Sequence, residues 1–190
     1  MNRSFAESTA RARVAHLLDA KSFHEILGPA ERVVSPHLAL LGVPYSFDDG
    51  VVIGCGTLSG QPVLIAAQEG EFMGGGVGEV HGAKLVGLFK RALRDKPAAV
   101  IVLAESGGVR LHEANAGLIA VAEVMRALLE ARAQGIAVIM LIVGGLKYIT
   151  SQGDAAGAAS ARNTIIYAVV GLVIVVFAQI LVKFVLSKAT

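Results

Sequence analysis

Two short glycine-rich segments are the places where this sequence could use its backbone for chemistry. The first spans residues 74–76, and the second is Gly107-Gly108; a segment with helical spacing follows each of them. A glycine-rich turn before a helix can present backbone N–H groups, which bind or stabilise the negative charge of a phosphate or an oxyanion. Glycine suits such a turn because a side chain would block the ligand and disfavour positive φ values.

Known motifs narrow the choice of anion. Lys84 is followed by Leu85, so the stretch MGGGVGEVHGAK contains no phosphate loop, and it has no fitting G-x-G-x-x-G fingerprint. No H-E-x-x-H or G-x-S-x-G motif is present. We interpret the scattered His81 and His112 as surface or packing residues, and we predict no metal site. Backbone stabilisation of an oxyanion is the chemistry best supported.

The glycine turns alternate with predicted strands and helices, which indicates an α/β fold. The strands are short apolar runs, and the helices show apolar residues at a 3.6-residue period. In chain order we predict a strand at 51–58, a turn at Ser59-Gly60, a strand at 62–68, a helix from Glu79, a strand at 98–105 and a helix at 111–133.

Apolar spacing also predicts which helix faces are buried. A helix over residues 5–18 is expected to turn Arg3, Arg11 and Arg13 outward. The helix at 111–133 is expected to bury one stripe: Leu111, Ala114, Leu118, Val121, Met125 and Leu128.

The composition is too apolar for an ordinary water-soluble protein. Of 190 residues, 54% are hydrophobic and 17% are charged, against a typical charged share of about 25%. These values exclude a disordered chain and favour a membrane segment. The net charge of +2 argues against a nucleic-acid partner, and Cys55, as the single cysteine, excludes an internal disulfide.

The apolar residues concentrate near the C-terminus. The uncharged run 165–182 would make a helix of about 27 Å, close to the roughly 30 Å hydrocarbon core of a bilayer. We therefore predict a domain at 1–143, a polar linker at 144–164 and a transmembrane helix at 165–186. The protein would be membrane-anchored with its N-terminal domain in the cytoplasm, or soluble in the cytoplasm if the tail does not insert.

The apolar stretch 135–149 has two interpretations. As a helix it would be about 22 Å long, which is short for a membrane span. As a run of β-branched residues after Gly135, the segment AVIMLIV is typical of a buried parallel strand. We favour the strand.

Several phrases resemble one enzyme family. These are ARARVAHLLDAKSFHEI, then DDGVVIGCGTLSGQPVLIAAQEGEFMGGGVGEVHGAKLVGLFKRAL, then SGGVRLHEANAGL. Together, over residues 10–142, they are similar to the carboxyltransferase branch of the crotonase-like superfamily. Within it they most resemble the β subunit of biotin-independent malonate decarboxylase. The resemblance implies a ββα superhelix, here truncated and followed by the transmembrane helix.

The resemblance also implies an activity and a site. The activity is that of a lyase subunit that decarboxylates a malonyl thioester and stabilises the resulting enolate in an oxyanion hole. By resemblance, the oxyanion-type turn maps onto Gly107 and Gly108. Substrate-binding positions map onto Gly74, Gly75, Gly76, Lys84, Arg110 and Glu113. Arg110 and Glu113 would order the turn or contact the acyl group.

The implied partners are a related γ carboxyltransferase subunit and an acyl carrier protein. No cofactor would bind directly, because the substrate arrives as a thioester on the carrier protein or a coenzyme A-like group. The membrane would be a further partner through 165–186.

The tail has a resemblance of its own. The phrases KYITSQGD and ARNTIIYA are similar to two-span, pilin-like type IV secretion proteins. We therefore expect a fusion near Gly144 that leaves the enzyme domain incomplete, so that an inactive enzyme is one expected outcome. The alternative function is a membrane structural or secretion-type protein that acts through its C-terminal span.

Overall fold

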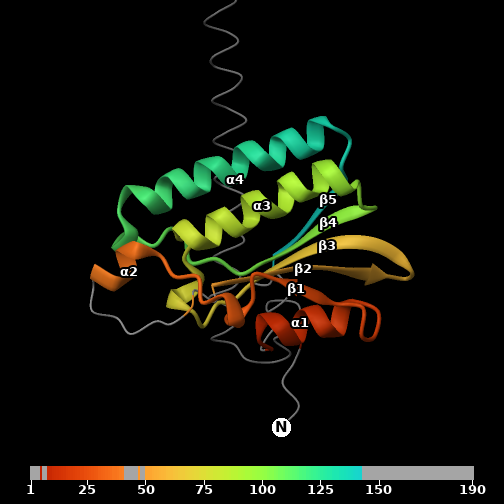
Figure 1. Cartoon of the computed structure of the whole chain (residues 1–190), viewed down its shortest axis with the longest axis horizontal. Coiled ribbons are helices and arrows are strands. Elements are labelled where there is room, and N and C mark those ends of the chain that lie inside the picture. The colour runs from red at the N-terminus through yellow and green to blue at the C-terminus, as the bar shows by residue number, and fades with distance from the viewer. Residues whose placement is uncertain (1–4, 6–7, 41–46, 48–49, 143–190) are drawn as a thin grey trace, which may run out of the picture. The chain divides into compact units, whose positions relative to one another are not determined.

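The computed structural model describes residues 5, 8–40, 47 and 50–142 (Figure 1). The chain divides into two compact units, Met1–Val143 and Gly144–Thr190, and all the described residues belong to the first unit. The predicted linker at 144–164 and the predicted transmembrane helix at 165–186 lie outside the described residues.

A five-stranded mixed sheet forms the centre of the first unit, with its strands in chain order across the sheet. The first three strands pair antiparallel, and the third, fourth and fifth pair parallel. The strands are β1 (His24–Ile26), β2 (Val51–Leu58), β3 (Gln61–Gln68), β4 (Ala99–Ala104) and β5 (Val138–Ile142).

The turn between β2 and β3 follows from its sequence. Ser59 and Gly60 have φ values of 51° and 76°, as a tight two-residue hairpin turn requires. The carboxylate of Asp19 accepts hydrogen bonds from the backbone N–H groups of both turn residues, at 3.0 and 2.8 Å. The predicted pair of strands joined at Ser59-Gly60 is confirmed.

Helices cover both faces of the sheet (Figure 1). The helices α3 (Glu79–Asp95) and α4 (Asn115–Ala133) lie on one face, and α1 (Ala10–Leu17) lies on the other. Each face of the sheet has its own hydrophobic core, and successive strand residues point into opposite cores. Ile53 packs on the α3 side, and its neighbour Val52 packs on the α1 side. The sheet is therefore apolar on both faces, as its continuous hydrophobic runs predict.

Short elements complete the unit. They are α2 (Pro36–Leu40) and three 3₁₀ turns at Pro29–Glu31, Met73–Gly75 and Leu111–Glu113. The turn at Met73–Gly75 lies in the first glycine-rich segment, and the turn at Leu111–Glu113 follows the second.

The crossover elements confirm the predicted α/β order. The helix predicted from Glu79 is α3, and the strand predicted at 98–105 is β4. After Gly135, which has a φ of 80°, the chain enters β5. The interpretation of 135–149 as a strand is thus confirmed over Val138–Ile142, where a helix is excluded, and 143–149 lie outside the described residues.

The second predicted helix begins later than expected. Residues Leu111–Glu113 form a 3₁₀ turn, and Ala114 has a φ of 47°. This residue of positive φ separates the turn from α4, which starts at Asn115. The prediction of one helix from Leu111 is therefore wrong at its N-terminal end.

The predicted stripe of α4 is wrong at most of its positions, although Val121 and Leu128 are half-buried. Leu118 and Met125 are 59% and 50% exposed, and Leu111 is more exposed still. The buried face carries smaller side chains, at Gly117, Ala120, Val124, Ala127 and Ala131. Spacing alone cannot choose between these two faces, because α3 approaches α4 so closely that only small side chains fit between them.

The contact between Gly82 of α3 and Ala120 of α4 shows why the facing positions carry small residues. A Cβ atom added at Gly82 of α3 would lie 2.5 Å from the Cβ of Ala120. Only small side chains fit on α4 at this point of contact with α3.

Arg13 contradicts the expectation that the basic residues of the first helix face solvent. Its side chain is completely buried, and its guanidinium contacts the carboxylate of Glu105 and the backbone carbonyl of Gln68. Arg11 keeps a half-exposed position in an ion pair with Glu25, with Nη2 and Oε1 2.7 Å apart. A buried arginine requires such a partner, and its partners come from β3 and from the end of β4.

Within the described part of the chain, no helix is long and apolar enough to cross a membrane.

Candidate functional site

The two glycine-rich regions lie side by side. We call residues 73–78 the first loop and residues 105–110 the second loop. The backbone N–H of Val77 donates to the carbonyl of Gly108 at 2.8 Å, and the N–H of Arg110 donates to the carbonyl of Val77 at 3.1 Å. These bonds form a parallel bridge between Val77 and Val109. The fold thus brings together the glycine positions that the sequence singled out separately.

Glycine is required where the loops touch. Gly75 has a φ of 70°, and a Cβ there would lie 2.3 Å from the carbonyl oxygen of Glu105. A Cβ at Gly107 would lie 2.2 Å from the carbonyl oxygen of Gly74. Both distances are too short for a side chain, so these glycines serve the contact between the loops.

Arg110 and Glu113 form a buried ion pair beneath the loops. Their side chains are 1% and 0% exposed, and Arg110 Nη1 lies 3.0 Å from Glu113 Oε1. Arg110 Nε also donates to the carbonyl of Gly76 at 2.8 Å, and the guanidinium lies over the ring of Phe72. These contacts hold the chain to itself, and the predicted roles of the pair toward the turn and the acyl group stay predictions.

Glu113 also occupies the N-terminus of α3. Its carboxylate accepts a hydrogen bond from the backbone N–H of Glu79, the first residue of that helix. A Cβ at Gly78 would lie 2.5 Å from Glu113 Oε1, so the missing side chain makes room for the carboxylate. The expectation of free N–H groups at this helix start is therefore corrected, because the chain supplies its own anion there.

The second loop presents a different arrangement. Residues 106–108 are exposed, and the N–H of Gly108 donates to the hydroxyl oxygen of Ser106 at 3.1 Å. Among the described residues, the N–H of Gly107 has no hydrogen-bond partner. Gly107 therefore offers a ready donor, and Gly108 offers one when the Ser106 hydroxyl turns away.

An apolar pocket of about 270 Å³ opens beside the second loop. It lies between the sheet and the α3–α4 pair, and it reaches the carboxyl ends of β3 and β4 at Gln68 and Ala104. In α/β sheets ligands bind beyond these ends of the strands. Its lining residues include Ser106, Gly108 and Val109 from the second loop, and Leu85, Phe89, Val121, Met125 and Met140 from the surrounding elements.

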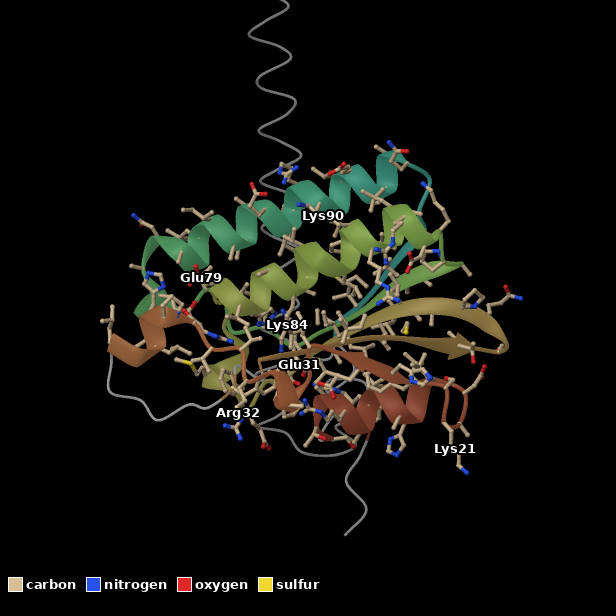
Figure 2. All side chains as sticks on the ribbon, in the orientation of Figure 1. Lys21, Glu31, Arg32, Glu79, Lys84 and Lys90 are labelled. Carbon is tan, nitrogen blue, oxygen red and sulfur yellow. The ribbon has the colours of Figure 1, made fainter. Side chains whose placement is uncertain are left out.

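Lys84 does not line this pocket. Its side chain, 3% exposed, sits between α3 and the sheet (Figure 2), and Nζ donates to the carbonyl of Val51 at 3.1 Å. The ammonium group also lies 4.4 Å from the centre of the Phe47 ring. Lys84 is on the predicted helix, but it is not among the residues that line the pocket.

Sequence reasoning missed a polar cluster next to the pocket. Its members are Arg13, Gln68, His81 and Glu105, which come from α1, β3, α3 and the second loop. His81 is buried and His112 is exposed, as packing and surface residues are. The sequence does carry a signal for this cluster, because Gln68 and Glu105 are the polar last residues of the apolar strands predicted at 62–68 and 98–105.

Comparison with known proteins identifies the family. The model of the carboxyl transferase domain family matches residues 2–167. The chain belongs to that family. Its match extends past Gly144, where the sequence predicts a fusion to a type IV secretion-like tail. The family match and the similar proteins named below give no support to that fusion, a membrane anchor or a secretion-type function.

The similar proteins include malonate decarboxylase subunits. The chain is 39% identical over 173 residues to the malonyl-S-ACP:biotin-protein carboxyltransferase MADC of Malonomonas rubra, covering 80% of this chain and 54% of that protein. In the Pseudomonas malonate decarboxylase hetero-tetramer in complex with malonate, one chain is 47% identical, with a TM-score of 0.65. That match covers 70% of this chain and 49% of the other.

A more distant structure shares the fold. The transcarboxylase 12S hexamer, solved with methylmalonyl-coenzyme A and methylmalonic acid, is 31% identical with a TM-score of 0.59 over 66% of this chain and 24% of that one. The domain therefore has the mixed α/β, crotonase-like carboxyltransferase fold. The chain spans about half the length of the malonate decarboxylase relatives that it matches.

Proposed function

We propose that this chain is the enolate-stabilising part of a subunit that acts on malonyl thioesters. The observation that carries the proposal is the pairing of the two glycine-rich loops at the mouth of the apolar pocket. The similarity to malonate decarboxylase chains supports the choice of substrate class.

The chemistry needs a place for one developing negative charge. When the bond between the malonyl α-carbon and its carboxylate breaks, CO₂ leaves and the electron pair moves into an enolate on the thioester oxygen. Protonation of the α-carbon then gives the acetyl thioester. N–H donors held in place at that oxygen lower the barrier, because they need not reorganise as the charge forms.

Gly107 and Gly108 are the proposed donors. The N–H of Gly107 has no partner among the described residues, and Gly108 lines the pocket. The Ser106 hydroxyl would exchange its bond to the Gly108 N–H for one to solvent or substrate when the thioester oxygen binds. The apolar lining would exclude water and strengthen both hydrogen bonds.

The first loop and the Arg110–Glu113 ion pair would act indirectly, by holding the second loop in place. Gly75 and Gly76 leave room for the second loop, and Gly74 supplies a positive φ of 66°. Arg110 and Glu113 fix the two loops to α3. Lys84 would contribute through packing against β2. The proposed substrate is an acyl carrier protein thioester, and the proposed partner is a related carboxyltransferase subunit, in keeping with the hetero-tetramer and carrier-protein names of the relatives. No directly bound cofactor is required for the enolate step.

The test compares two glycines with similar surroundings. Gly108 has a φ of 111° and Gly60 has a φ of 76°, and a Cβ at either would meet nothing within 4 Å. CO₂ release from malonyl carrier protein would be measured with the partner subunit present. Gly108→Ala keeps the backbone N–H, but alanine disfavours a φ of 111°, so the peptide should rotate and the donor should lose its orientation. We expect kcat to fall about 100-fold, the usual effect of losing one oxyanion donor, and Gly60→Ala to leave kcat unchanged. A folded wild-type complex that releases no CO₂ above background would refute the proposal.

One observation favours a second candidate. The Malonomonas relative is named a carboxyltransferase to a biotin protein, and the same enolate would form if biotin accepted the CO₂. Adding a biotinyl carrier protein to the assay distinguishes the two functions. Carboxybiotin formation would indicate transfer, whereas release of CO₂ regardless of biotin would indicate simple decarboxylation.

A further inference from the structure

The side chain of Gln68 connects the end of β3 to the start of the second loop. It is 5% exposed and lines the pocket. Its Oε1 lies 2.8 Å from the backbone nitrogen of Glu105, and its Nε2 lies 3.1 Å from His81 Nε2. One carboxamide therefore spans the space between the second loop and α3.

The Glu105 contact determines which group donates and which accepts in the hydrogen bonds that join Glu105, Gln68 and His81. A backbone N–H can only donate, so the Gln68 atom facing Glu105 must be the carbonyl oxygen. The amide NH₂ of Gln68 then faces His81, and His81 Nε2 must accept. A neutral imidazole with an acceptor at Nε2 carries its proton on Nδ1.

The Glu105 peptide is also held from other directions. Arg13 contacts the Glu105 carboxylate and the backbone carbonyl of Gln68. The Glu105 carbonyl packs against Gly75, where a Cβ would lie only 2.3 Å away. Gln68 thus holds the N–H group of Glu105, and Gly75 of the first loop packs against the carbonyl group of the same residue. Gly107, the proposed oxyanion donor, follows two residues later.

We infer that Gln68 and neutral, Nδ1-protonated His81 are positioning residues that hold the second loop in the orientation its oxyanion donors need. The inference rests on the function proposed above and adds two residues to that site. Gln68 touches the loop directly, and His81 acts through Gln68 by fixing which way the carboxamide points. A flipped carboxamide would set its NH₂ group against the Glu105 N–H and release the loop.

The first experiment reads the tautomer without any substrate. The full chain, labelled with ¹⁵N in histidine, would be studied by long-range ¹H–¹⁵N correlation at neutral pH, with His81→Gln used to assign the signal. We expect His81 to show a protonated Nδ1 and an unprotonated Nε2. A proton on Nε2, or on both ring nitrogens, would overturn the inference.

The second experiment uses variants that differ in one acceptor. His81→Gln keeps an oxygen that can accept from Gln68, whereas His81→Leu fills similar space without one. We expect Leu to accelerate hydrogen exchange of the Glu105 N–H more than 10-fold, while Gln restores protection. Equal exchange in the two variants would overturn the inference.

Gln68 has a matched control on its own strand. Gln68→Leu removes the acceptor for Glu105, and Gln61→Leu makes the same change at the exposed start of β3. In the decarboxylation assay we expect Gln68→Leu to lower kcat at least 10-fold with KM nearly unchanged, and Gln61→Leu to change neither. An effect of Gln68→Leu confined to KM or to the yield of folded protein would count against a positioning role.

The readouts separate the two proposals. The tautomer and the exchange of the Glu105 N–H report on the positioning of the loop even when no CO₂ is released. If both behave as expected and the assay stays silent, the proposed function fails and the hydrogen-bond arrangement stands. If CO₂ is released and the tautomer or exchange result is contrary, the positioning inference fails alone.

Discussion

The guanidinium of Arg110 and the carboxylate of Glu113 pair at 3.0 Å in a position that solvent scarcely reaches. Through them the second loop is joined to the carbonyl of Gly76 in the first loop and to the N–H of Glu79 at the start of α3. A single ion pair therefore fixes three backbone segments beside the proposed oxyanion site.

Loss of the Glu113 charge should destabilise the domain. Glu113→Gln leaves the Arg110 guanidinium buried without its counter-charge and turns an NH₂ group toward existing donors. We expect a loss of about 3–5 kcal/mol in the free energy of unfolding, measured by urea denaturation. The control is Glu123→Gln, which breaks an exposed ion pair with Arg126 at the same i,i+3 spacing. Equal stabilities of the two variants would show that the burial of the pair has no consequence.

Gly74 and Gly75 should respond differently to the same substitution. Both have positive φ values, 66° and 70°, but only at Gly75 would a Cβ collide with the backbone, at the Glu105 carbonyl. We expect Gly74→Ala to cost about 1–2 kcal/mol through backbone strain alone. Gly75→Ala should cost more, because the second loop must also move. Thermal unfolding of both variants would measure the difference, and a larger loss at Gly74 would contradict the loop contact.

The buried face of α4 can be tested by two substitutions two residues apart. Ala120 is 8% exposed and packs near Gly82, whereas Leu118 is exposed. Ala120→Leu should destabilise the domain by about 1–3 kcal/mol through overpacking. Leu118→Lys should change the free energy of unfolding by less than about 0.5 kcal/mol. The opposite ranking in chemical denaturation would restore the stripe that the sequence predicts.

Asp19 should make the hairpin sensitive to acid. The hydroxyl of Thr57, at 2.6 Å, and the N–H groups of Gly60 and Ser59 hold the pKa of Asp19 below its ordinary value of 3.8. Because the folded-state pKa is lowered, the carboxylate stabilises the fold above the unfolded-state pKa, and this contribution disappears as the pH falls through the folded-state pKa. The stability difference between wild type and Asp19→Asn should therefore be constant near neutrality and shrink below about pH 4.

NMR titration of the Asp19 carboxyl carbon checks the same claim directly. A midpoint at or above the ordinary aspartate value would show that the three hydrogen bonds do not favour the ionised form. A stability difference that grows on acidification would contradict the sign of the linkage.

Local sequence determined most of the secondary structure. The hairpin at Ser59-Gly60, the helix from Glu79 and the strand after Gly135 all follow from apolar runs bounded by turn residues. These features depend on neighbours along the chain, so their signals are readable without the fold. The glycine positions at 74–76 and 107–108 were also readable, although their spacing could not show that the two groups touch.

The tertiary structure decided which side chains are buried and what they meet. Arg13 looks like a solvated helix residue until β3 and the second loop bring Gln68 and Glu105 to it. The face of α4 depends on the close approach of Gly82 and Ala120, which no single-helix pattern contains. The bonds from Gln68 to His81 and Glu105 join residues that are 13 and 37 positions apart. Such contacts are set by the packing of whole elements, because burial and hydrogen-bond partnership are properties of the assembled fold and not of local spacing.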